Sequence, residues 1–276
     1  ANAISSLNSA NVPIVVRSGS VFALDTQNSV LPSNWTFEEN SVLGLRQSHN
    51  NLTVIPTNAF LGANSGTQTL SSSSLVPESG NVYRLGGGGA TLLINVSSGL
   101  NDGVEPRSVQ IGYVGVGGTG TVRFGRANDY SGGTLVSQGS TLTLEVSNSV
   151  GTGLVRVVGG TLNVSATNAF RENQNLTLSG GWGAFGTANM TAANGFGNGT
   201  IEVDIGGRLA LNNGSALGSN AIVNVRGGGA VFTTVSPVSG QFNFGHGSLL
   251  RIENTAALDF SKAISVDGQL RIEHNL

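Results

Sequence analysis

Apolar and polar residues alternate over short stretches that recur along this chain. Examples are LVRVVGGTLNV, IEVDIGGRLAL and ISVDGQLRI, in which glycine separates two alternating runs. Alternation with a period of two, rich in β-branched residues, is typical of half-buried strands. Glycine between two such runs permits a tight corner or a close approach of two backbones. The pattern therefore predicts pairs of short strands that meet at glycine corners.

The corner glycines return at a nearly constant interval. They are Gly118, Gly139, Gly160, Gly181, Gly207, Gly228, Gly247 and Gly268. Most steps are 21 residues long, which is the length of one coil in a stack whose coils bury a shared core. A propeller blade needs about 40 residues, and the fixed frame of a leucine-rich repeat is missing. We predict an all-β fold, a right-handed parallel β-helix (solenoid) with coils of about 21 residues.

The repeat divides the chain into two parts and contains one irregular step. Residues 86–276 keep the phase, whereas residues 1–85 have strand-like stretches without it and are expected to form irregular β coils or a cap. The step from Gly181 to Gly207 is longer, which predicts an insertion near residues 183–200. Insertions in solenoids form loops on one face, often the binding face. This one is either a longer loop without a role or a ligand-binding loop that uses Trp182, Phe185 and Phe196.

Composition narrows the class of protein. Charged residues make up 10% of the chain and the net charge is −2, so no basic surface for nucleic acid or anionic lipid is expected. No apolar stretch is long enough for a membrane-spanning helix. The chain has no cysteine, which excludes disulfides and thiolate metal sites. Its first residues, ANAISSLNSA, do not resemble a signal peptide, so we expect a mature, secreted chain.

One stretch carries a resemblance to a known family. It is IGYVGVGGTGTVRFGRANDYSGGTLVSQGSTLTL, residues 111–144. The matching residues are Gly118, Thr119, Gly120, Thr121, Val122, Ala127, Asn128, Tyr130, Ser131, Gly132, Gly133, Thr134, Gly139, Thr141 and Leu142. They resemble the autotransporter-associated β-strand repeat, also called the passenger-associated transport repeat, and the likeness is looser over residues 83–276.

The resemblance implies a right-handed β-helix in an exported bacterial surface protein, and it implies no catalytic residues. The family's C-terminal translocator barrel is not recognisable in the chain, which ends QLRIEHNL. We therefore expect either a processed passenger domain or export by another route.

Two glycine-containing motifs suggest enzyme chemistry but have simpler interpretations. Residues 245–247, Gly-His-Gly, resemble a motif of the polygalacturonases, yet the chain has no Asp-Asp pair, and glycoside hydrolysis needs paired carboxylates. Residues 115–120, GVGGTG, fit a dinucleotide-binding pattern, but that pattern requires a following helix, and TVRF predicts a strand. Both motifs are expected to be corners.

Two pairs of acidic residues remain as candidates. Glu202 and Asp204 share one face of a strand and could act as an acid and a base, or hold a cation, unless Arg226 screens them on a solvated face. Asp102 and Glu105 could bind calcium or simply form a turn. The histidines lack metal-ligand spacing. We expect no enzyme activity, no metal and no cofactor.

Asparagine sequons for N-glycosylation are frequent, as is expected in a chain so rich in Asn, Ser and Thr. They lie at Asn34, Asn51, Asn95, Asn163, Asn175, Asn189, Asn198 and Asn213. These positions predict modification only where a host supplies the machinery.

Three functions remain open. The first is a structural extracellular or cell-surface rod that forms or belongs to a filament, stalk or surface layer, by end-to-end self-association or as part of a larger chain. The second is an adhesin or glycan-binding passenger domain that contacts a glycan or a host surface. The third is a β-helix enzyme that degrades polysaccharides.

Overall fold

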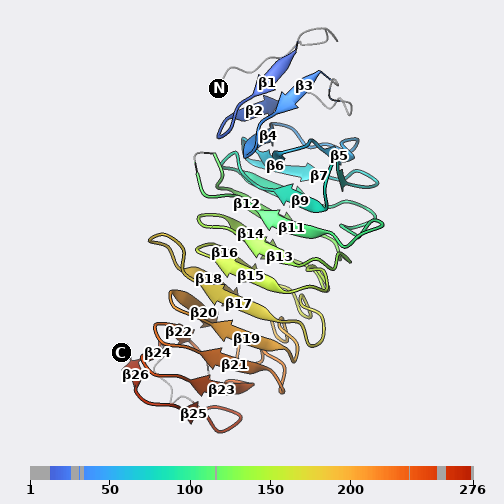
Figure 1. The fold of residues 1–276 in the computed structure, drawn as a ribbon. Helices are drawn as coiled ribbons and strands as arrows, with labels where there is room; N and C mark the ends of the chain where they lie inside the picture. The colour runs from blue at the N-terminus through green and yellow to red at the C-terminus, as the bar shows by residue number, and fades with distance from the viewer. Residues whose placement is uncertain are drawn as a thin grey trace.

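The chain folds into an elongated stack of parallel coils that runs from the N-terminus to the C-terminus (Figure 1). The computed structural model describes residues 13–25, 31, 34–115, 117–235, 237–253 and 259–274. The predicted all-β parallel β-helix is confirmed: coils are about 22 residues long, and the described residues include no helix.

One long face of the stack is a 12-stranded parallel sheet. Each strand between the two edges pairs with the strand one coil earlier and one coil later, so the sheet is continuous along the rod. In spatial order its strands are β2 (Val21–Leu24), β4 (Ser41–Leu45), β6 (Ala59–Ala63), β9 (Val82–Leu85), β11 (Ser108–Ile111), β13 (Thr134–Val136), β15 (Val155–Val158), β17 (Leu176–Ser179), β19 (Thr200–Val203), β21 (Ile222–Val225), β23 (Gln241–Phe244) and β25 (Ser265–Val266).

The second long face is a 10-stranded parallel sheet. Its strands are β7 (Thr67–Leu70), β10 (Thr91–Ile94), β12 (Thr121–Phe124), β14 (Thr141–Leu144), β16 (Thr161–Val164), β18 (Gly186–Met190), β20 (Gly207–Leu211), β22 (Ala230–Thr233), β24 (Ser248–Ile252) and β26 (Leu270–His274). The third side of each coil is a connection without a continuous sheet, marked by isolated bridges such as Phe196 with Leu217.

The core is built from residues that occupy the same place in successive coils. In the 10-stranded sheet, strand pairing aligns one inward row: Val122, Leu142, Leu162, Ala188, Leu209, Val231 and Leu250. All are at most 2% exposed. Fully burying one such valine or leucine contributes about 1.5–3 kcal/mol, so the alternating pattern of each strand stabilises the stack coil by coil.

Corners between the two sheets are glycines, as predicted, with a small shift in register. Gly139, Gly228 and Gly247 have positive φ values of 74°, 83° and 76°, a backbone conformation that favours glycine. At three coils the residue with positive φ directly precedes the predicted glycine: Gly117, Gly159 and Gly206 adopt this conformation instead of Gly118, Gly160 and Gly207. The corners also stack, and the Gly206 amide donates to the Gly228 carbonyl at 3.3 Å.

The first coils are less regular. Two small sheets lie there, β1 (Ile14–Val16) with β3 (Trp35–Phe37) and β5 (Val54–Ile55) with β8 (Val76–Pro77). Strands β4 and β6 nevertheless belong to the 12-stranded sheet. The boundary at residue 85 stays a prediction, and part of residues 1–85 lies outside the described residues.

The GVGGTG motif lies in the corner between β11 and β12, which is long and folds back over these first coils. The Tyr113 ring, in the same corner, lies 5.0 Å from the Phe60 ring. The Gly88 amide donates to the Gly117 carbonyl at 2.9 Å. Strand β12 follows, as expected, so the motif has a structural role.

Candidate functional site

The irregular repeat step is an enlarged corner between β17 and β18. This corner consists of residues 180–185, whereas residues 159–160 alone join β15 to β16. It displays Trp182, which is 94% exposed, and Phe185, which is 49% exposed. Its base is held by the Gln138 side chain, whose amide nitrogen donates to the Trp182 carbonyl at 2.6 Å. Residues 183–185 of this corner fall within the 183–200 stretch that the sequence indicated, and residues 180–182 precede it.

Phe196 is not part of this surface, so its assignment to a ligand-binding loop was wrong. The ring is 0% exposed and packs against Phe170 with ring centroids 4.9 Å apart. Phe196 also forms a bridge with Leu217 one coil later. The physical reason is that the third side of the coil needs an inward apolar side chain as well. The recurrence of Val150, Phe170, Phe196 and Leu217 at about one coil length is the signal that would have placed it.

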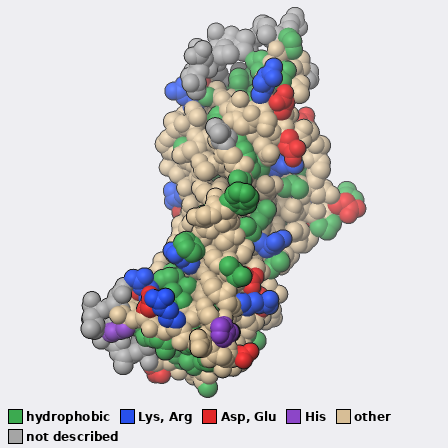
Figure 2. All heavy atoms as spheres, turned by 60° about the vertical axis from the view of Figure 1, so that its left-hand side comes forward, with side chains coloured by type: hydrophobic (Ala, Val, Ile, Leu, Met, Phe, Trp, Pro, Cys, Tyr) green, Lys and Arg blue, Asp and Glu red, His purple; other side chains and the backbone are tan. Residues whose placement is uncertain are grey.

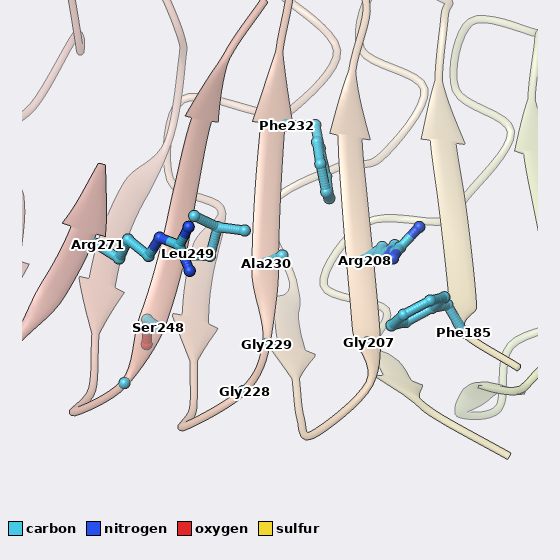
Figure 3. A pocket seen from close by; sticks show the side chains of 11 residues that line it. Phe185, Gly207, Arg208, Gly228, Gly229, Ala230, Phe232, Ser248, Leu249 and Arg271 are labelled. Atoms are coloured by element: carbon cyan, nitrogen blue, oxygen red, sulfur yellow. The ribbon is translucent and has the colours of Figure 1, made fainter. Parts of the chain in front are cut away.

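A second feature, not predicted from the sequence, is a hollow on the outward face of the 10-stranded sheet. Its volume is about 260 Å³. We call it the Arg208 hollow; its side chains come from Phe185, Arg208, Ala230, Phe232, Leu249 and Arg271. Phe185 and Arg208 lie at one end and Arg271 at the other (Figure 3). In the space-filling view, basic, acidic and hydrophobic side chains are neighbours on the lower part of the molecule (Figure 2).

Aromatic rings and guanidinium groups alternate along this face. The Cζ atom of Arg208 lies 3.1 Å from the Phe185 ring centroid and 5.7 Å from that of Phe232. Arg251 approaches Phe232 from the next strand at 5.9 Å. Partial desolvation lowers the pKa of Arg208, and repulsion from Arg251 lowers it further. These contacts orient the arginines, since a guanidinium group favours the face of an aromatic ring.

The acidic candidates are accounted for by local contacts. Arg226 pairs with Glu202 at 3.1 Å and with Asp204 at 3.5 Å, which confirms that Arg226 screens these half-buried carboxylates. Asp102 accepts hydrogen bonds from the Arg107 amide at 2.7 Å and from the Ser131 amide and hydroxyl at 2.9 and 2.7 Å. These bonds, that of Arg107 first, lower the pKa of Asp102. Asp102 therefore organises a turn between two coils.

Neither the histidines nor other groups assemble a metal site within the described part of the chain. There, no group of three or more His, Asp or Glu side chains is placed to hold an ion. His246 is exposed in the corner between β23 and β24, where its glycine neighbours make the turn. His49 is buried near the other end of the rod.

The sequon asparagines have different surroundings. Asn51 and Asn175 are exposed, whereas Asn34, Asn95, Asn163, Asn189, Asn198 and Asn213 are half-buried. Asn163 and Asn189 form part of a ladder on adjacent strands, where the Asn189 amide donates to the Asn163 Oδ1 atom at 2.8 Å. Modification of these asparagines stays a prediction.

Residues that carry the family resemblance have structural roles. Asn128 is buried; its Oδ1 accepts from the Leu100 amide at 2.7 Å and its Nδ2 donates to the Ser149 carbonyl. Tyr130 is also buried and shares a hydrogen bond of 2.6 Å with the Thr134 hydroxyl. At Gly133, where φ is 92°, a Cβ atom would lie 2.7 Å from the Leu154 carbonyl oxygen. The motif therefore links neighbouring coils.

Comparisons of the chain with models of protein families, with curated proteins and with solved structures found no match. Within the described residues, no helix has the length and hydropathy needed to cross a membrane. The molecule is thus defined by its fold, a parallel β-solenoid of about 11 turns.

Proposed function

We propose that this chain is a structural rod of an exported or cell-surface protein, and that copies of it dock end to end to form a filament. The uninterrupted pairing of both long sheets supports a mechanical role, because every coil is hydrogen-bonded to its neighbours. The likeness of residues 111–144 to the autotransporter-associated repeat supports export to a surface.

The main support for filament formation is the exposure of apolar side chains at inward positions of the last described coil. Ile272 pairs in register with Leu250, and Val266 pairs with Phe244. Leu250 and Phe244 are buried, 2% and 1% exposed, whereas Ile272 and Val266 are 59% and 45% exposed. They occupy inward positions that one more coil would cover.

The ends of the 12-stranded sheet suit such docking. Among the described strands, β2 and β25 are its two edges, and the free edge of a strand can template further pairing. Contact between two different ends does not close, so it yields an open filament instead of a dimer. The low net charge of −2 leaves little repulsion between copies.

Electron microscopy of the purified chain tests this proposal. We expect filaments whose axial repeat is close to the rod length, about 55 Å for a 12-stranded stack at about 4.8 Å per coil. Ile272→Lys should give separate rods, because it places a charge in the contact. Ile205→Lys is the matched control, since Ile205 is 76% exposed in a corner and not at an end.

Separate rods at every concentration, unchanged by Ile272→Lys, would refute end-to-end docking of copies. The last coil would then be a surface for a neighbouring segment of a longer chain.

A further inference from the structure

The Arg208 hollow has a regular chemical layout that follows from strand pairing. Arg208, Ala230, Leu249 and Arg271 are register partners on β20, β22, β24 and β26, so they form one outward row along the rod. At about 4.8 Å per coil, the two arginines of this row are roughly 14 Å apart. Ala230 and Leu249 form an apolar floor between them.

The charge of the hollow is positive. Its lining residues include two arginines and no carboxylate. Among the described residues, no acidic side chain pairs with Arg208. Arg271 pairs with Glu273 at 2.5 Å, but its side chain is 76% exposed and retains free donors toward solvent. An anionic ligand would therefore complement the hollow at both ends.

Apolar surface in the hollow faces outward. Phe185 is 49% exposed, and Phe232 and Leu249 are half-buried at outward positions of their strands. The ring faces and the isobutyl group offer flat, shallow contacts instead of a deep pocket for one anchoring side chain. Flat apolar contacts combined with separated cations suit a chain of rings that carries regularly spaced negative charges.

We propose that the Arg208 hollow binds an acidic polysaccharide, whose sugar rings lie on Phe185, Phe232 and Leu249 and whose carboxylates pair with Arg208 and Arg271. A guanidinium group binds a carboxylate through two parallel hydrogen bonds, which fixes the ligand at each end. The row spans several coils, so the site fits a short run of sugars better than a single small molecule.

An acidic peptide is the less suitable occupant. Extended peptides usually bind by adding a strand to a sheet edge. Strands β20, β22 and β24 are each paired on both sides, so their backbone groups are already used. The hollow therefore offers side-chain contacts alone, and these match rings and charges better than a peptide backbone.

The test is calorimetric titration of the full chain with polygalacturonate at low ionic strength. Fully methyl-esterified polygalacturonate, which keeps the rings and removes the charge, is the control ligand. We expect binding of the acidic polymer alone, weakened by added salt. Arg208→Gln and Arg271→Gln should each lower the affinity roughly tenfold, the loss expected for one charge-assisted contact.

Arg156→Gln is the matched control variant, because Arg156 is an exposed arginine on β15 of the other sheet. It should leave the affinity within about twofold. Leu249→Glu, which places a negative charge on the floor, gives a second measure if an arginine variant proves unstable, and it should abolish binding.

Three results would overturn the proposal. The first is no binding of polygalacturonate, and the second is equal binding of its methyl ester. The third is binding of poly-glutamate as tight as that of polygalacturonate, which would indicate an acidic peptide. The proposed site does not require end-to-end docking. We therefore expect Ile272→Lys, which should give separate rods, to bind polygalacturonate as the parent chain does.

Discussion

His49 is a buried histidine whose two ring nitrogens have no hydrogen-bond partner among the described residues. Burial lowers the pKa of His49 from its ordinary value of 6.5, because the charged ring would lose its hydration. The folded chain therefore binds this proton less readily than the unfolded chain. The resulting stability is present above pH 6.5 and is lost as the pH falls below it.

Replacing His49 with phenylalanine should remove this acid sensitivity. We expect His49→Phe to raise the free energy of unfolding at neutral pH by about 1 kcal/mol, because it removes two ring nitrogens that are buried without hydrogen bonds. The variant should therefore unfold at a higher urea concentration. Below pH 6 the difference between variant and parent should grow. Urea titrations at several pH values measure it, and parallel pH profiles for the two chains would contradict the argument.

Tyr130 gives the opposite pH dependence. Complete burial raises the pKa of Tyr130 from 10.0 to about 12, although its bond to Thr134 works against the shift. The stability it contributes is fully present below pH 10 and is lost as the pH rises toward 12. Two pKa units correspond to roughly 2–3 kcal/mol.

The alkaline loss of stability should therefore be smaller in Tyr130→Phe. That variant starts from a lower stability at neutral pH, by about 1 kcal/mol, because the hydrogen bond to Thr134 is missing. Denaturant titrations between neutral pH and pH 11 compare the two slopes. Equal slopes would mean that Tyr130 titrates as readily in the folded state as in the unfolded chain.

At the scale of single elements, the strands were predictable because every coil requires the same alternation of outward polar and inward apolar residues. Thr67, Thr91, Thr121, Thr141, Thr161 and Thr187 are aligned by pairing into one outward row. From Thr91 onward each is followed by a buried leucine, valine or alanine, so the alternation of outward and inward residues can be read directly from the sequence. Threonine suits this place because its β-branched side chain packs on a pleated surface.

Other features depend on register, which the interval between glycines defines only to about one residue. Gly159 and not Gly160 is the left-handed residue, and the two cannot be told apart by spacing alone. The Arg208 hollow is a stronger case. Arg208, Ala230 and Leu249 lie on three different coils and form one row only because β20, β22 and β24 pair in one particular register. A shift by one residue would turn them inward.

The enlarged corner should be dispensable for folding. Replacing residues 180–185 with Gly-Gly, as in the corner at residues 159–160, leaves the pairing of β18 with β16 intact. We expect a change in unfolding free energy of less than about 1 kcal/mol, since shortening a surface loop changes its closure entropy little. Thermal unfolding measures it.

The same replacement should weaken binding of polygalacturonate, because it removes Phe185 from the Arg208 hollow. A large loss of stability would instead show that residues 180–185 organise the coil and are not dispensable for folding.

At the scale of the whole molecule, the strands of each coil pair only with those of the coil before and the coil after it, and a few side-chain contacts, such as that of Gln138 with Trp182, reach two coils away. The stability of such a stack is a sum of coil and interface contributions, so central coils are covered on both sides and end coils on one. Strand β26 illustrates the difference: Arg271, Ile272 and His274 are exposed, whereas the inward residues of β16 are fully buried. A rod of this kind unfolds most readily from its ends.

Hydrogen exchange, measured strand by strand, can therefore detect the docking of copies. In dilute solution, the amides of β25 and β26 should exchange fast and those of β14 and β16 slowly. If a second copy covers Ile272, raising the protein concentration from about 1 µM to about 100 µM should slow exchange in β25 and β26 by tenfold or more. The central strands should not change.

Ile272→Lys separates docking from general stabilisation, because it should keep β25 and β26 fast at both concentrations while leaving the central strands slow. Exchange in β26 that is independent of concentration in the parent chain would instead mean that its exposed apolar residues meet no second copy. Any partner that covers Ile272 would then be a different one, such as an adjoining segment of a longer chain.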